Sequence, residues 1–217
     1  MKNLTFKSTY LLTALAVATA LTGLSGCIPL VVGGAVATGT VVATDRRTSG
    51  SVVEDNGIDL KAANRISENL GDRVHVNVTS YNRRVLLTGE VPSAQDKQLV
   101  EKIVSNVENV TAIVNELEIM GPSTFGQRSS DTLVTSRVKS ALVDAKDLIS
   151  NAFKVVTERG TVYVMGRVTQ REANRATEII TGTSGVQKLV RIFDIISEDE
   201  LARTLPQKPA PAPSSKN

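Results

Sequence analysis

Apolar residues in the middle of the chain follow first a helical period and then a strand period. Between residues 58 and 70 they recur every four positions, which predicts an amphipathic helix with one buried face. Residues 73–79 and 84–91 alternate instead between apolar and polar side chains, which predicts two β-strands. The short segment Tyr81-Asn82-Arg83 between them fits a hairpin turn.

A second helix and a third strand complete this pattern. Pro92 and Ser93 open a segment to about residue 106 whose apolar residues again lie on one side of a helix. Residues 110–119 then alternate as a strand. The predicted order is therefore helix, strand, strand, helix, strand.

The same order occurs a second time further along the chain. Val85-Leu86-Leu87-Thr88-Gly89-Glu90-Val91 recurs as Val162-Tyr163-Val164-Met165-Gly166-Arg167-Val168, 77 positions later. This duplication predicts two copies of one small domain, at residues 51–120 and 131–197, joined by a linker at residues 121–130.

Each copy is expected to be an α+β unit with the order α-β-β-α-β. In the second copy the helices are expected near residues 131–142 and 170–182, and the strands at 153–157, 161–168 and 186–196. A three-stranded mixed sheet with both helices on one face is the simplest arrangement that buries the apolar side of every element.

The N-terminus has the order of a secretory signal. Lys2 and Lys7 give it a positive start, and residues 10–24 are apolar without a charge. It closes with Leu24-Ser25-Gly26-Cys27, which resembles the bacterial lipobox and contains the only cysteine of the chain. The resemblance implies removal of residues 1–26, a thioether to diacylglycerol at Cys27 and acylation of the new amino group. A thiolate is the strong nucleophile that this chemistry needs.

Two other interpretations of this segment remain open. Cys27 could be an incidental thiol behind an ordinary signal, or the apolar run could be an uncleaved transmembrane helix. Five glycines and prolines between residues 23 and 34 disfavour a continuous span. Ile28 stands where an inner-membrane retention signal would carry aspartate. The lipobox resemblance therefore implies transport to the outer membrane, with the chain on its periplasmic face.

The segments that flank the duplication are predicted to be flexible. Residues 27–50 are small, apolar and glycine-rich, which is typical of a leader between lipid and domain. Within it, Arg46 and Arg47 are candidates for contacts with anionic lipid head groups, or are simply solvated. Residues 198–217 include a proline–alanine alternation and are predicted to be disordered, with at most a helical turn at 197–204.

The duplicated unit resembles the BON domain. The resemblance rests on the hydrophobic-x-hydrophobic-x-Gly-x-Val core of each copy and on the closing segments at residues 109–114 and 185–190. Two such units behind a lipobox are similar to the dual BON-domain outer-membrane lipoproteins, the DolP type. Asp131-Thr132 with Lys139, and Gly166-x-Val168-Thr169, fit that subfamily. The resemblance implies phospholipid binding by the second unit and a role in envelope integrity.

Charge separates the two copies and supports this expectation independently. Residues 58–120 hold seven basic and nine acidic side chains, a net charge of −2, whereas residues 128–196 hold eleven and seven, a net charge of +4. A positive unit near a membrane is attracted to anionic lipid, and a negative one is repelled. Neither copy has a dense basic stripe, so nucleic acid is not an expected partner.

The chain offers few residues for catalysis or metal binding. Its single histidine, His75, lies in a predicted strand without a partner at metal-ligand spacing, and Cys27 is committed to lipid. Gly89 and Gly166 lie inside predicted strands, where glycine indicates a close approach or a bulge rather than a phosphate-binding loop. We therefore expect no enzyme activity, no metal and no cofactor.

The first helix of the second copy is the candidate lipid-contact surface. Ser129-Ser130-Asp131 are candidates for its N-cap. Leu133 lies almost opposite Ala141-Leu142 in helical projection, so it is expected at the surface with basic residues beside it. An apolar tip beside basic residues suits shallow insertion into a membrane interface. The predicted phospholipid-binding residues are Arg128, Leu133, Val134, Arg137, Val138 and Lys139.

Two interpretations of function follow from these patterns. In the first, the chain is a non-enzymatic, lipid-anchored periplasmic protein that binds anionic phospholipid, such as phosphatidylglycerol, through its second unit. In the second, both units form an interaction module for envelope-assembly or peptidoglycan-associated proteins. A separate structural alternative is that Leu133 packs against the neighbouring unit and the basic residues beside it are only solvated. A sugar or other small ligand would need a concave pocket, which the sequence does not indicate.

Overall fold

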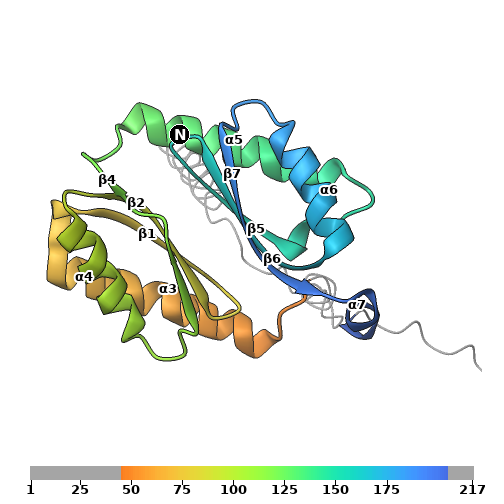
Figure 1. Ribbon diagram of the computed structural model, residues 1–217, viewed down its shortest axis with the longest axis horizontal. Helices are drawn as coiled ribbons and strands as arrows, with labels where there is room; N and C mark the ends of the chain where they lie inside the picture. Colours follow the sequence, from red (N-terminus) through yellow and green to blue (C-terminus); the bar gives the residue numbers. More distant parts are fainter. Residues whose placement is uncertain (1–44, 205–217) are drawn as a thin grey trace, which may run out of the picture. The chain divides into compact units, whose positions relative to one another are not determined.

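A computed structural model describes residues 45–204 and confirms the order α-β-β-α-β in both copies (Figure 1). The elements of the first copy are α3 (Ser49–Leu70), β1 (His75–Tyr81), β2 (Arg84–Val91), α4 (Ala94–Ser105), β3 (Ala112–Asn115) and β4 (Glu118–Ile119). Those of the second copy are α5 (Phe125–Asp144), β5 (Phe153–Glu158), β6 (Thr161–Thr169), α6 (Gln170–Thr181) and β7 (Lys188–Ile196). Two 3₁₀ turns, η2 (Gly71–Arg73) and η3 (Ser150–Ala152), precede β1 and β5, and a last helix, α7 (Glu198–Thr204), follows β7. Cys27 and the proline-rich segment lie outside the described residues.

Each sheet is mixed, as predicted, with the second strand of the copy at its centre. β2 pairs antiparallel with β1 and parallel with β3 and β4, and β6 pairs antiparallel with β5 and parallel with β7. The strand predicted at 110–119 is interrupted between β3 and β4 in the first copy. The break lets Leu117 enter the core at 2 % exposure, while Lys97 Nζ donates to its carbonyl oxygen at 2.7 Å.

Both hairpins turn through two residues with positive φ, the geometry that matches the twist of paired strands. These are Asn82 and Arg83 in the first copy, and Arg159 and Gly160 in the second. The first strand, predicted at 73–79, begins later because residues up to Arg73 form the 3₁₀ turn η2. The pairing register therefore runs from His75 opposite Glu90 to Tyr81 opposite Arg84.

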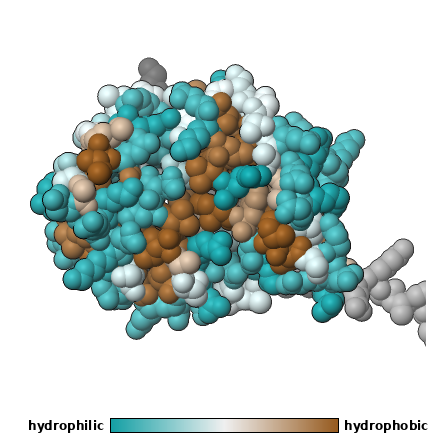
Figure 2. Space-filling model, in the orientation of Figure 1, coloured by the Kyte–Doolittle hydropathy of each residue, from teal (hydrophilic) through white to brown (hydrophobic). Residues whose placement is uncertain are grey.

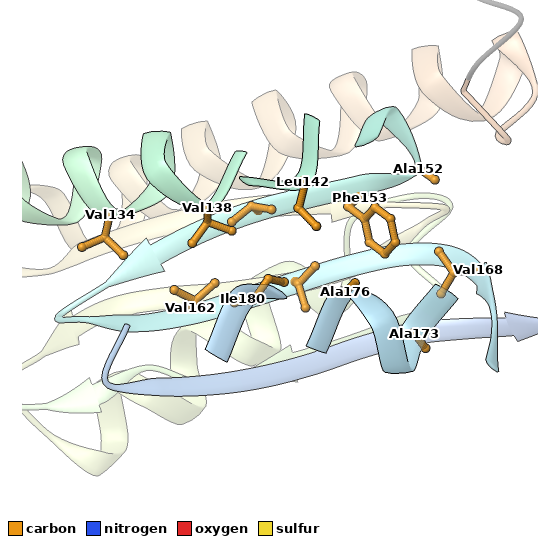
Figure 3. Close-up of a cluster of buried hydrophobic side chains, with 12 residues drawn as sticks. Val134, Val138, Leu142, Ala152, Phe153, Val162, Val168, Ala173, Ala176 and Ile180 are labelled. Carbon is orange, nitrogen blue, oxygen red and sulfur yellow. The ribbon is translucent and has the colours of Figure 1, made fainter. Parts of the chain in front are cut away.

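Two helices cover one face of each sheet and bury a separate apolar core. In the first copy, α3 and α4 cover the sheet, and in the second α5 and α6 do so (Figure 1). Figure 3 shows the second core, in which side chains from α5 and α6 point toward the strands. Its fully enclosed residues, at 0 % exposure, are Val138, Ala152, Val162, Val164, Val168, Ala176 and Ile180.

The helix-free faces of the two sheets contact each other. A third apolar cluster joins them, formed by Tyr81, Leu86, Tyr163, Met165 and Ile192. Tyr81 also bonds across the contact, since its hydroxyl donates to the Ala152 carbonyl at 3.4 Å and accepts from the Arg167 amide at 3.3 Å. Figure 2 shows apolar side chains across the middle of one face, over the edge strands β3, β4 and β7.

Gly89 and Gly166 permit a close approach between neighbouring strands, as their positions in the sequence indicated. A Cβ on Gly89 would lie 2.1 Å from the carbonyl oxygen of His75, and one on Gly166 would lie 2.6 Å from that of Ala152. Gly89 also has a φ of 111°, which other residues rarely adopt. Neither glycine is therefore free to take a side chain.

The segments predicted to be flexible are partly structured. α3 begins at Ser49, inside the predicted leader, because the Thr48 side chain caps it by accepting from the Ser51 amide at 3.1 Å. At the other end, residues 198–204 form α7 rather than disordered tail, and Leu201 is buried at 7 % exposure. Residues 27–44 of the predicted leader and 205–217 of the predicted tail lie outside the described residues.

Candidate functional site

Helix α5 begins six residues before its predicted N-cap. Thr124 is the cap, because its side chain accepts from the Gln127 amide while the Gln127 side chain accepts from the Thr124 amide. Residues 125–130 are therefore helix rather than linker. The prediction of a cap at Ser129-Ser130-Asp131 was wrong, because these three residues lie inside the helix.

Asp131 holds the hairpin turn of its own domain. At 6 % exposure, its carboxylate accepts from the amides of Arg159 and Gly160, both at 2.8 Å. Asp55 on α3 does the same for the first hairpin, accepting from Asn82 and Arg83 at 2.7 Å. Burial alone would raise the pKa of Asp55, but hydrogen bonds from Ser80, the two turn amides and Arg47 hold its pKa below the usual value. The duplication therefore extends to the device that fixes each helix on its hairpin.

The inner face of α5 belongs to the core. Val134 is 4 % exposed and Val138 is fully buried, and both point toward β5 and β6 (Figure 3). The prediction that these two residues contact phospholipid was therefore wrong. Their four-residue spacing marks the buried stripe of the helix.

The outer face of α5 presents an apolar line to solvent. Phe125 is 87 % exposed, Leu133 57 % and Val143 65 %. At about 100° per residue, Phe125 and Val143 share one line five turns apart, with Leu133 within about 80° of it. The positions between them on this face are small and hydroxylated: Thr132, Ser136 and Ser140, all exposed. Three large apolar side chains on one exposed helix face make this face the candidate interaction surface.

Three basic residues flank this line and are exposed. Arg128 donates to the Ser123 hydroxyl at 3.0 Å, and Arg137 reaches the Ser184 carbonyl at 3.5 Å. Lys139 lines the grooves on both sides of its part of the helix. Within residues 45–204, none of the three forms an ion pair, so their charge is available to an anionic partner. We call Phe125, Leu133, Val143 and these three basic residues the outer face of α5.

The sequence pattern did not identify Phe125 and Val143 as residues of this surface. Phe125 fell in the predicted linker, although Thr124-x-x-Gln127 is a capping-box pattern that could have placed it in the helix. Val143 lies one residue beyond the predicted end of the helix at residue 142, so it was not placed on the helix surface. Phenylalanine is one of the residues that interfacial amphipathic helices carry on their apolar face.

Arg46 and Arg47 do not face solvent or lipid. The Arg46 guanidinium, 3 % exposed, donates to both carboxylate oxygens of Glu172 at 2.7 Å. Arg47 donates to Asp45 and Asp55 and lies over the ring of Tyr81, 4.5 Å from its centroid. Both sequence interpretations of these arginines were therefore wrong. They connect the end of the leader to α6 of the second copy and to α3 of the first.

His75 has partners that the sequence did not reveal. Its Nδ1 lies 2.7 Å from Oε2 of Glu90, whose Oε1 accepts from Arg159 Nε at 2.7 Å. Burial alone would raise the pKa of Glu90, but the hydrogen bonds from His75 and Arg159 hold its pKa below the usual value. Glu158, 8 % exposed, accepts from Asn77 at 2.9 Å. Burial raises the pKa of Glu158 despite that bond, and the charge of Glu90 raises it further.

The fold and these sites define a protein with two BON domains. The BON domain family model matches residues 55–121 and again residues 130–195, and the chain belongs to this family. A similar protein is the outer membrane lipoprotein DolP of Haemophilus influenzae, which is 36 % identical over 78 % of this chain and 89 % of its own length. The 21 kDa hemolysin of Actinobacillus pleuropneumoniae is 29 % identical over 70 % of this chain and 79 % of its own.

Among solved structures, the chain is similar to the C-terminal domain of CdsD, a structural protein of the type III secretion system of Chlamydia trachomatis. The TM-score is 0.28 at 10 % identity, over 70 % of this chain and 100 % of that one. A likeness this weak adds nothing to the assignment. Among residues 45–204, no helix combines the length and the apolar character needed to cross a membrane.

Proposed function

We propose that the chain is an outer-membrane lipoprotein, anchored at Cys27 on the periplasmic side, that binds anionic phospholipid through the outer face of α5 and supports envelope integrity. It acts without catalysis. The observation that carries this proposal is the line of exposed Phe125, Leu133 and Val143 beside three exposed basic residues that form no ion pair within residues 45–204. The name of the Haemophilus relative, an outer membrane lipoprotein, supports the location.

The chemistry of the outer face of α5 suits shallow insertion into a bilayer. Removing a large apolar side chain from water contributes about 1.5–3 kcal/mol when its burial is complete. Each basic residue near an anionic surface contributes about 1 kcal/mol. Three of each give an interaction that is weak and reversible alone, and a lipid anchor strengthens it by raising the local concentration at the bilayer.

Vesicle binding of residues 45–217 tests this proposal without the anchor. This segment keeps both apolar cores and the contacts that join the domains. We expect it to sediment with vesicles of phosphatidylcholine and phosphatidylglycerol but not with phosphatidylcholine alone, and to bind less in high salt. Leu133→Asp combined with Phe125→Ser should weaken binding about tenfold or more, since both side chains are exposed and the fold does not depend on them.

The matched control is Leu99→Asp, which places the same charge on an exposed leucine of α4 in the first domain. It should leave binding unchanged. Equal losses in the control and the α5 variant would contradict the assignment to this helix, and so would binding that ignores the lipid charge.

The second interpretation, a protein-interaction module, has one observation in its favour. Ile119, Met120 and Ile195 are 54 %, 40 % and 49 % exposed on and beside the edge strands β4 and β7. A photo-reactive side chain at position 195 tests this surface in cells. A single specific cross-linked envelope protein, with no vesicle binding by the α5 face, would favour the module over the lipid-binding function.

A further inference from the structure

Three ligand-type side chains converge where the two BON domains meet. His75 comes from β1, Glu90 from β2 and Glu158 from the end of β5, so the group draws on both domains. One nitrogen or oxygen atom from each residue lies within 4.8 Å of the other two. The three residues are far apart in the sequence, so they do not form a short metal-binding motif that the sequence could reveal.

The charges around this cluster do not balance. Glu90, Glu158 and Asp131 are 2 %, 8 % and 6 % exposed, and the guanidinium beside them is that of Arg159. Three carboxylates therefore face the one guanidinium. Within the described residues Glu158 has no ion-pair partner, and its bond from Asn77 is that of a neutral amide. Buried charges in proteins are paired or coordinate metals.

Neighbouring side chains hold the two glutamates of the cluster in place by hydrogen bonds. Arg159 donates to Oε1 of Glu90, while Oε2 lies 2.7 Å from His75 Nδ1. Asn77 donates to Oε2 of Glu158 at 2.9 Å, which orients that carboxylate. Outer partners of this kind hold the ligands of metal sites in position. A groove of about 470 Å³ lined by His75, Asp131 and Glu158 leads from solvent to the cluster.

We propose that His75, Glu90 and Glu158 bind a divalent transition-metal cation, best matched by Zn²⁺, at the junction of the two BON domains. Zinc takes imidazole nitrogen and carboxylate oxygen at about 2.0–2.2 Å, so ligand atoms around it lie about 3.3 Å apart. The atoms present within 4.8 Å reach that spacing by small side-chain rotations. Binding the metal through Nδ1 displaces the hydrogen that this nitrogen donates to Glu90, so the neutral ring then carries its proton on Nε2. Water from the groove completes the coordination.

A bound cation would join the domains, because its ligands come from both. Any ligand that binds only the folded state raises the stability as its concentration exceeds the dissociation constant. The metal would therefore hold β1 and β2 of the first domain against β5 of the second.

Zinc titration of the full lipidated chain in detergent, without a histidine tag and after chelator treatment, tests the site. We expect one zinc per chain by calorimetry and a higher melting temperature with zinc. The thioether at Cys27 keeps that sulfur from competing. Co²⁺ in place of zinc should give the visible absorption of a four- or five-coordinate site.

Two variants and a control locate the binding. Glu158→Gln keeps an acceptor for Asn77 but removes a ligand charge, and His75→Gln removes the nitrogen ligand; each should weaken zinc binding about tenfold or more. Without zinc at pH 7, Glu158→Gln should melt at the same temperature as the parent or higher, since it removes an unpaired buried charge. A Glu158→Gln chain that melts normally but binds zinc weakly would have lost the site and not the fold. Glu68→Gln, at an exposed position of α3, should bind zinc like the parent.

Two results would overturn the proposal. One is the absence of saturable zinc binding by the parent chain. The other is zinc binding that survives both Glu158→Gln and His75→Gln unchanged, because the metal would then lie elsewhere on the surface.

Discussion

Replacing Arg46 with alanine is expected to lower the free energy of unfolding by about 3–5 kcal/mol, because it leaves a buried carboxylate without its partner. Arg46 and Glu172 are each 3 % exposed and form two hydrogen bonds of 2.7 Å. Arg46 also donates to the Arg167 carbonyl at 3.1 Å. Glu172 further accepts from the Thr169 amide in the capping box of α6. Urea unfolding of residues 45–217 at neutral pH measures the effect.

The pH dependence separates lost charge pairing from lost packing. Burial alone would raise the pKa of Glu172, but Arg46 and the Thr169 amide hold it below the ordinary value of 4.5. A lowered carboxylate pKa contributes stability above pH 4.5, and this is lost as pH falls through the folded-state pKa. The difference between parent and Arg46→Ala should therefore shrink below about pH 4.5. The double variant Arg46→Met with Glu172→Gln should regain most of the stability, and a deficit that is independent of pH and not regained would contradict the ion-pair explanation.

Replacing Cys27 with serine is expected to abolish fatty-acid labelling and to release the mature chain from membranes. A serine hydroxyl is not a thiolate at neutral pH, so the thioether cannot form. Each buried acyl methylene contributes about 0.8 kcal/mol, and stable anchoring needs more than one chain. Metabolic palmitate labelling and fractionation of the envelope measure both effects.

Ser8→Ala is the matched control, since it removes a hydroxyl upstream and keeps Leu24-Ser25-Gly26-Cys27 intact. It should remain labelled and membrane-bound. Lipid label retained by the Cys27→Ser chain would place the anchor elsewhere.

The fold could be predicted from the sequence because the hydrophobic periodicity and the internal duplication indicate the same helices and strands. The four-residue spacing from Ile58 to Leu70 and the repeated segment at Val162–Val168 placed both cores, and every residue of the first of these stripes is buried. Element ends were less certain. The third strand of the first copy is broken to admit Leu117, and α5 begins at Phe125, because local hydrogen bonds rather than periodicity set those ends.

The candidate site was predicted in part. Leu133, Arg128, Arg137 and Lys139 lie on the exposed side of α5, and their contact with lipid stays a prediction. The four-residue spacing of Val134, Val138 and Leu142 is the pattern of a buried stripe, so it could have separated Val134 and Val138 from the exposed side.

Long-range pairs could not be predicted at all. Arg46 and Glu172 are 126 positions apart, and Asn77 and Glu158 are 81 apart. Such partners meet only because the two sheets contact each other through Tyr81, Tyr163 and their neighbours. Two arginines in a glycine-rich leader have the same local pattern whether they are solvated or buried.

A tryptophan at position 125 gives the most direct test of lipid binding by the outer face of α5. The chain has no tryptophan, so Phe125→Trp introduces a single fluorophore at an exposed position of that face. With vesicles containing phosphatidylglycerol, its emission should shift to shorter wavelength and be quenched by brominated acyl chains. Leu99→Trp on α4 should show neither change. Emission from position 125 that stays unshifted and unquenched at saturating vesicle concentration would contradict insertion of this helix into the membrane.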